Sequence, residues 1–189
     1  MKTRPAKPSD DGALVPARAI RAIFLLGFMG AGKTSVGKAL AETLRWKFED
    51  LDDRIVAQES RSIAQIFAEQ GEAGFRVAER KALVSALEEL PATGVVMALG
   101  GGAFVPSENS ALLALPGFLT IFLNAPVEEL FRRCNEHSVA RPMRQRFEEF
   151  CRLNAQRQST YRKAQLTIET LGKQVHEIAN EIAAALTTD

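Results

Sequence analysis

The sequence contains few cysteines, no long apolar run and almost no net charge, and these shortages exclude whole classes of protein. Only two cysteines, Cys134 and Cys151, occur among 189 residues, and their spacing is not that of metal ligands. We interpret both as free thiols, which favours a reducing compartment. No stretch approaches the roughly 18 consecutive apolar residues of a membrane-spanning helix. The basic N-terminus has no apolar segment like that of a signal peptide, so we expect a cytoplasmic protein that does not bind membranes.

Charge is balanced over the whole chain but not along it. The formal net charge is +1, which indicates no general attraction to nucleic acid. Between Arg132 and Lys163, however, nine Lys or Arg residues stand against three acidic residues. Because the rest of the chain balances this excess, it predicts a small anionic ligand rather than a nucleic acid.

Strand-like and helix-like patterns alternate from residue 20 onward. Five short apolar runs are predicted as strands, at residues 22–26, 46–48, 95–99, 118–123 and 165–168. Strands that alternate with helices form a parallel sheet covered on both faces, so we predict an α/β fold of three layers, α/β/α. The length suits one domain, which we expect over residues 20–189. Residues 1–19 contain three prolines and are expected to form a flexible N-terminal extension.

A phosphate-binding loop follows the first predicted strand. Residues 27–34 read Gly-Phe-Met-Gly-Ala-Gly-Lys-Thr and precede an amphipathic helix. The glycines let backbone N–H groups and the helix N-terminus meet phosphate oxygens, with Lys33 at the β- and γ-phosphates and the Thr34 hydroxyl on Mg²⁺. This predicts a P-loop NTPase fold that binds ATP. A GTPase is disfavoured, since neither an NKxD-like motif nor a D-x-x-G switch after the second strand occurs.

An acidic turn follows the second predicted strand. Asp50 and Asp52 stand two residues apart there, so we expect both to point the same way at the carboxyl edge of the sheet, where ligands bind. One carboxylate can then hold the water shell of the metal, and the other can accept a proton from a substrate hydroxyl. The alternative is a solvated acidic turn.

Two further features are typical of a substrate site. Arg76 has Glu79 three residues later on a predicted helix, and Glu79 can orient the guanidinium toward a carboxylate; the alternative is a surface ion pair. Gly100–Gly102 directly follows a buried strand, where three glycines permit close approach of a ligand to backbone N–H groups. The alternative there is a flexible loop.

Together these motifs resemble the shikimate kinase family. The resemblance runs in consistent order from about Ile23 to Leu186, and its segments are specific in combination rather than singly. They are GFMGAGKTSVGKALA (27–41), FEDLDDRI (48–55), RSIAQIF (61–67), GEAGFRVAE (71–79), ALGGGAF (98–104), ARPM (140–143) and AQRQSTYRKA (155–164).

The resemblance implies a reaction and a set of site residues. The reaction is MgATP-dependent phosphorylation of the 3-hydroxyl of shikimate, a step of aromatic amino-acid biosynthesis, with Lys33, Asp52 and Arg141 as catalytic residues. Mg²⁺ is implied to bind Thr34 directly and Asp50 through its water shell. The implied ATP-binding residues are Gly30, Ala31, Gly32, Lys33, Thr34, Ser35, Arg133 and Arg141. The implied shikimate-binding residues are Asp52, Phe67, Phe75, Arg76, Gly100, Gly101, Gly102 and Arg157.

The same resemblance implies a mobile lid over about residues 135–146, in which Arg141 folds over the phosphates, and suggests a monomer. The stretch 134–140 is about one residue longer than in some family members, so the arginine at adenine can be Arg132 or Arg133.

Two other functions are weighed. A kinase for another polyol acid, such as gluconate, shares the scaffold, but the paired arginines and the glycine triplet favour shikimate. A non-catalytic sensor of an aromatic acid is expected to have lost catalytic groups, whereas Lys33, Thr34, Asp52 and Arg141 are all present.

Overall fold

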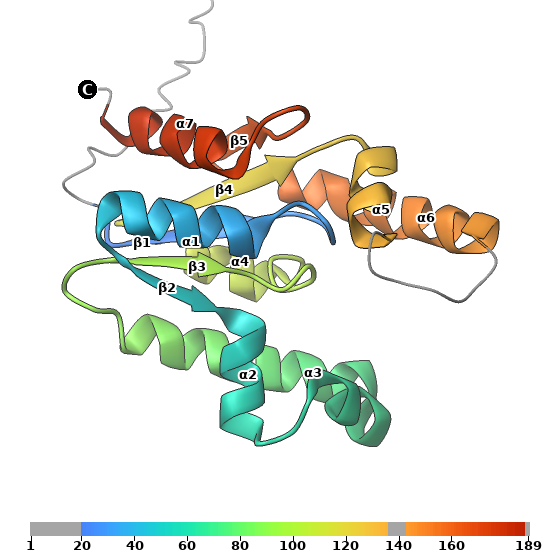
Figure 1. Ribbon diagram of the computed structural model, residues 1–189. Coiled ribbons are helices and arrows are strands. Elements are labelled where there is room, and N and C mark those ends of the chain that lie inside the picture. Colours follow the sequence, from blue (N-terminus) through green and yellow to red (C-terminus); the bar gives the residue numbers. More distant parts are fainter. Residues whose placement is uncertain (1–19, 136–142, 188–189) are drawn as a thin grey trace, which may run out of the picture.

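The centre of the molecule is a five-stranded parallel sheet (Figure 1). The computed structural model describes residues 20–135 and 143–187. The strands pair in the order β2-β3-β1-β4-β5, and every neighbouring pair is parallel, which confirms the α/β fold expected from the sequence. Their bounds are β1 (Ala22–Leu26), β2 (Lys47–Asp50), β3 (Val95–Ala98), β4 (Phe118–Asn124) and β5 (Leu166–Glu169).

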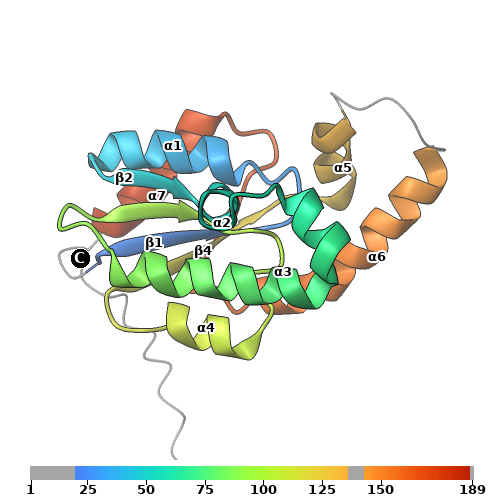
Figure 2. The ribbon, with the colours of Figure 1, turned by 90° about the horizontal axis from the view of Figure 1, so that it is seen from below.

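Helices cover both faces of this sheet, as the three-layer prediction requires. Helices α1 (Lys33–Leu44) and α7 (Val175–Thr187) pack side by side on one face. Helices α3 (Ile63–Glu88) and α4 (Ser107–Leu113) lie on the opposite face (Figure 2). Central strand β1 is accordingly buried at all five positions, because both of its faces and both of its edges are covered.

Three more helices lie toward the carboxyl ends of the strands. Helix α2 (Leu51–Glu59) follows β2 directly, and helices α5 (Val127–Asn135) and α6 (Met143–Tyr161) pack against each other beyond β4 (Figure 1). Within the described ranges, no helix is both long and apolar enough to cross a membrane. The register of the sheet pairs Leu25 of β1 with Ala98 of β3, so the segments that follow these two strands emerge next to each other.

One prediction about the acidic turn is wrong in its geometry. Asp52 does not continue the strand but lies in the first turn of α2, and Asp50 is the N-cap residue. The Asp50 carboxylate accepts a hydrogen bond of 3.1 Å from the backbone N–H of Asp52. Because Asp is a favoured N-cap, the helix begins at once, and the strand-type alternation that we expected does not apply to these residues.

Other helical segments also differ from a simple pattern. Helix α3 is kinked at Gly71, which has φ 67° and ψ −170°. Residues 143–146, expected in the lid loop, belong to α6, since Met, Arg and Gln are good helix formers. Helix α4 was not predicted from its seven residues. Asn135, also expected in the lid, is the last residue of α5, and lid residues 136–142, including Arg141, lie outside the described residues.

Candidate active site

The phosphate loop is folded around its own lysine. Lys33 Nζ donates hydrogen bonds to the carbonyl oxygens of Gly27 (3.0 Å) and Phe28 (3.2 Å). Burial lowers the pKa of Lys33, while the nearby charges of Asp52 and Asp50 oppose this shift. The two hydrogen bonds hold the Lys33 amino group over the loop, beside the N-terminus of α1, where a phosphate would bind.

Gly30 permits the tight turn of this loop. It has φ 79°, and a Cβ atom at this position would lie 2.5 Å from the carbonyl oxygen of Leu130 in α5. A side chain at residue 30 would therefore push the loop away from α5, and only glycine fits.

Thr34 and Asp50, the two groups expected near Mg²⁺, meet in the structure. Thr34 Oγ1 donates a hydrogen bond of 2.9 Å to Asp50 Oδ2. Among the described residues there is no group of three or more His, Cys, Asp or Glu side chains that could hold a metal ion by protein ligands alone. One hydroxyl and one carboxylate beside a phosphate loop nevertheless fit Mg²⁺, which binds few protein ligands and takes phosphate oxygens and water for the rest.

Asp52 presents an unused acceptor to the site. Its Oδ1 atom is buried and has no hydrogen-bond partner. Burial raises the pKa of Asp52, and the charge of Asp50 raises it further, while Lys33 lowers it. A substrate hydroxyl at this position would satisfy the buried oxygen, which would otherwise cost stability.

Two carboxylates lie close to Gly100, the first glycine of the triplet. A Cβ atom at Gly100 would lie 2.8 Å from Asp52 Oδ1 and 3.2 Å from Glu79 Oε1. Both oxygens are buried without a partner. The turn that follows β3 therefore approaches the Asp52 carboxylate closely, and a glycine at residue 100 permits this approach.

The other two glycines lie against the two arginines. A Cβ atom at Gly102 would lie 2.5 Å from Nη2 of Arg76, and one at Gly101 would lie 3.1 Å from Nη1 of Arg157. These two guanidinium groups come from α3 and α6, which are far apart in the sequence. The structure thus gathers both arginines of the implied shikimate-binding set around one turn of backbone.

Arg76 is not a simple surface ion pair. Its Nη1 atom donates to Glu79 Oε2 at 2.8 Å, and the Glu79 side chain is only 1% exposed. Burial raises the pKa of Glu79, although the bond to Arg76 opposes the shift. A second bond of 3.1 Å goes to the exposed Glu72. Two carboxylates on adjacent turns therefore fix the direction of the guanidinium.

Aromatic rings lie next to both arginines, and the Arg76 guanidinium is 5.2 Å from the centroid of the Phe75 ring. Phe67 and Phe75 stack with ring centroids 4.6 Å apart, and Phe75 is buried whereas Phe67 is 41% exposed. The Arg157 guanidinium lies 5.6 Å from the centroid of the Phe28 ring in the phosphate loop. This cation–π contact ties the candidate substrate arginine to the nucleotide loop.

A cavity of about 510 Å³ opens beside the phosphate loop, between α1, α5 and the segment before α7. Both Arg132 and Arg133 line it, so it does not distinguish them as the residue at adenine. Hydrogen bonds from Arg132 and from Arg133 lower the pKa of Glu129 to about 2, which keeps its carboxylate charged. The cavity is lined by Gly30, Ala31, Gly32, Ser35, Val36, Glu129, Arg132, Arg133, Gly172, Lys173, Gln174, Val175 and Ile178.

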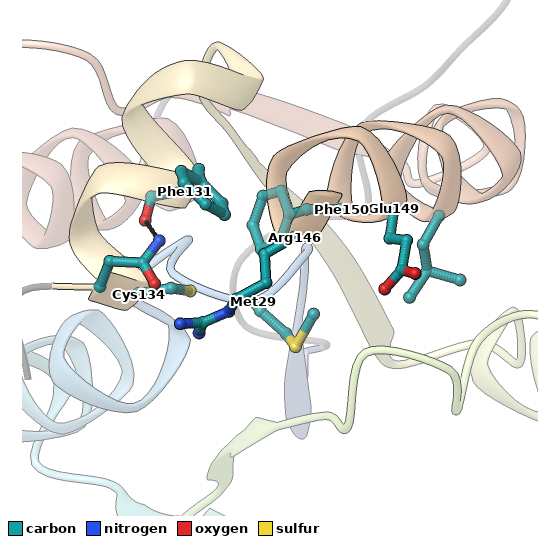
Figure 3. A pocket seen from close by; sticks show the side chains of 8 residues that line it. Met29, Phe131, Cys134, Arg146, Glu149 and Phe150 are labelled. Atoms are coloured by element: carbon teal, nitrogen blue, oxygen red, sulfur yellow. Dashed lines mark hydrogen bonds between the residues drawn. The ribbon is translucent and has the colours of Figure 1, made fainter. Parts of the chain in front are cut away.

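A second cavity, of about 290 Å³, lies between α5, α6 and the phosphate loop (Figure 3). Met29 of the loop and Cys134 of α5 face Arg146 and Phe150 of α6 across it. Cys134 and Cys151 are both free and half-buried, as expected from the sequence. The helices on either side of the lid segment are therefore not packed tightly together at this point.

Comparisons with known proteins agree with this geometry. A family model described as shikimate kinase matches residues 29–187. The chain belongs to the shikimate kinase family. A shikimate kinase of Geobacter metallireducens is 39% identical over 170 residues, which cover 88% of this chain and 92% of that protein.

Solved structures of the family have the same fold. A shikimate kinase from Acinetobacter baumannii, in complex with shikimate, is 30% identical with a TM-score of 0.75, over 90% of this chain and 97% of that one. A gluconokinase from Sinorhizobium meliloti is 18% identical with a TM-score of 0.60, over 87% of this chain and 90% of that one, and shares the fold alone.

Sequence reasoning did not find several residues that the structure places at the site. Glu129 and the loop 172–174 line the cavity beside the phosphate loop, but neither carries a recognisable motif. Asn109 of α4 is 2% exposed and donates to the carbonyl oxygen of Ala103 at 2.9 Å, directly after the glycine triplet. In the sequence, Asn109 could have been recognised only as a polar residue on the apolar face of a short helix.

Proposed function

We propose that this chain transfers the γ-phosphoryl group of MgATP to the 3-hydroxyl of shikimate, giving shikimate 3-phosphate and ADP. The observation that carries the proposal is the convergence of Asp52, Arg76 and Arg157 on the glycine triplet, beside the lysine of the phosphate loop. A hydroxy acid bound there can place its carboxylate on the arginines and a hydroxyl at Asp52, next to the phosphates.

The nucleotide half of the site serves to neutralise charge. Lys33 can exchange its bonds to two loop carbonyls for phosphate oxygens, and the N–H groups of residues 30–35 can bind the remainder. Thr34 would hold Mg²⁺ directly, with Asp50 bonded to its water shell, and the ion would neutralise charge on the phosphates. Arg133 or Arg132 would contact adenine, and Arg141 would close over the phosphates.

The substrate half serves to position the hydroxyl. The free Oδ1 of Asp52 would accept the hydrogen bond of the attacking hydroxyl and take its proton as the phosphoryl group transfers. Arg76 and Arg157 would hold the carboxylate, and N–H groups of Gly100–Gly102 would meet the ring hydroxyls. Phe67 and Phe75 would cover the ring.

The same observations rank the alternatives. The gluconokinase with this fold is only 18% identical to this chain, whereas shikimate kinases with high coverage are 30% and 39% identical. A non-catalytic sensor has no use for Thr34 and Asp50 bonded to each other beside a phosphate loop. We further propose a cytoplasmic location, because two unpaired thiols suit a reducing compartment, and a monomeric state, as in the family it resembles.

One measurement tests the function directly. ADP release should be slow with MgATP alone and should rise strongly when shikimate is added, and gluconate should give no comparable increase. Absence of stimulation by shikimate would overturn the proposal, and stimulation by gluconate alone would favour the alternative kinase.

Replacing Arg157 with Ala should raise the KM for shikimate on the order of 10²-fold, because a charge-assisted bond to the carboxylate is lost. The KM for ATP should change far less. Steady-state kinetics with each substrate varied in turn would measure this, and Arg152→Ala on the same helix provides the matched control. Equal effects on both KM values would contradict the role of Arg157.

A further inference from the structure

One buried hydroxyl near the candidate substrate site has no role in the proposed function. Tyr161 is the last residue of α6, lies one helical turn after Arg157 and is 1% exposed. It is the only tyrosine of the chain. Its ring packs against Phe122 of β4, with centroids 5.3 Å apart. Ring packing alone would be served equally well by phenylalanine, so the hydroxyl requires its own explanation.

The Tyr161 hydroxyl is hydrogen-bonded to the backbone of the glycine triplet. It donates a hydrogen bond to the carbonyl oxygen of Gly101. A Cβ atom at Gly101 would lie 3.7 Å from this hydroxyl and 3.1 Å from Nη1 of Arg157, so all three groups meet at one point. The Arg157 guanidinium is thus close to the hydroxyl as well as to the glycine turn. A phenol has one proton to donate and lone pairs to accept, which suits a group placed between a carbonyl and a guanidinium.

The bond to Gly101 also sets the direction of the next N–H group. No cis peptide bond occurs among the described residues, and in a trans peptide the C=O and N–H bonds point in opposite directions. Holding the Gly101 carbonyl toward Tyr161 therefore turns the Gly102 N–H away from it. Burial raises the pKa of Tyr161, although the charge of Arg157 opposes the shift. The hydroxyl thus keeps its proton at neutral pH and remains a donor.

We infer that the Tyr161 hydroxyl is a positioning group that holds Arg157 and the Gly101–Gly102 peptide at a fixed distance and orientation. Arg157 can then bind the carboxylate of a substrate molecule while the glycine N–H groups bind its ring hydroxyls. The inference rests on the proposed function and adds a residue to it. In this scheme Tyr161 does not touch substrate or nucleotide itself but acts through Gly101 and Arg157, which do.

Tyr161→Phe is the decisive variant, because it keeps the ring and removes only the hydroxyl. We expect the KM for shikimate to rise about tenfold, while the KM for ATP stays within about twofold of its original value. Thr120→Val is a matched control, since Thr120 also uses a buried hydroxyl to join two elements, by bonds of 3.0 and 3.1 Å to Gln165. It should lower thermal stability without a selective effect on the KM for shikimate.

A double variant tests the link to Arg157. If Tyr161 acts partly through Arg157, removing its hydroxyl should have a smaller effect in an Arg157→Ala background than in the original chain. If the increases in the KM for shikimate caused by the two single substitutions multiply fully in the double variant, that link is contradicted. An unchanged KM for shikimate in Tyr161→Phe, or equal rises in the KM values for shikimate and ATP, would overturn the inference. If the parent enzyme is active with shikimate, the proposed function still stands in that case. A parent chain that shikimate does not stimulate would overturn both.

Discussion

Replacing Asp52 with Asn is expected to lower kcat with shikimate by at least about 10²-fold. The amide cannot take the proton of the attacking hydroxyl, yet it keeps the size of the side chain. Binding of MgATP should be retained, because neither the bonds from Lys33 to the loop carbonyls nor the contact between Thr34 and Asp50 involves the Asp52 side chain. Steady-state kinetics together with titration of a non-hydrolysable ATP analogue would measure both quantities.

The neighbouring Asp53 provides the control for this experiment. It is exposed, whereas Asp52 directs a buried, unpartnered oxygen toward Gly100. Asp53→Asn should therefore leave kcat nearly unchanged. A similar small effect from both variants would show that Asp52 neither accepts the proton nor orients the hydroxyl.

Replacing Gly102 with Ala is expected to raise the KM for shikimate on the order of 10²-fold. The new methyl group would lie 2.5 Å from Nη2 of Arg76, closer than non-bonded atoms can approach. The guanidinium is held by Glu79 at 2.8 Å and Glu72 at 3.1 Å, so it must give up at least one of these bonds to move. Its alignment with the substrate carboxylate would be lost with them.

Removing the Arg76 side chain tests whether the steric clash with its guanidinium causes the effect of Gly102→Ala. In an Arg76→Ala background, the KM for shikimate is already raised, and Gly102→Ala should add little to it. Full multiplication of the two effects would mean that the methyl group acts on the backbone or on the substrate instead. Unfolding curves of all four proteins would separate a change of site geometry from a loss of stability.

The sequence predicted the sheet and the phosphate loop because both depend on local patterns. Short apolar runs between helical segments define the strands, and the loop needs glycines at fixed spacing. The glycine triplet was found for the same reason. Asp52 was assigned to the site through the family resemblance and through an extended-strand argument, and the latter is wrong, since the N-cap at Asp50 starts a helix there. The structure nevertheless brings the Asp52 carboxylate next to Gly100, because the end of β2 fixes the position of the whole turn.

What the sequence did not reveal depends on contacts between distant elements. Tyr161 and Gly101 are 60 positions apart in the sequence, and no pattern in either segment predicts the hydrogen bond between them. Glu129 joins the cavity beside the phosphate loop only because α5 packs near the segment before α7. Such partners are defined by packing in three dimensions, which a periodicity of 2 or 3.6 residues does not encode.

The position of β1 has a consequence for synthesis of the chain. Of the five strands of the sheet, β1 is made first, but its two sheet neighbours, β3 and β4, come much later in the sequence. Until residues 118–124 have been made, one edge of a five-residue segment that is buried throughout in the finished molecule has no partner strand. Unpaired apolar edges of this kind associate with other chains. A nascent chain arrested before Phe118 should therefore aggregate or bind chaperones, whereas one that extends beyond Asn124 should be much less prone to either.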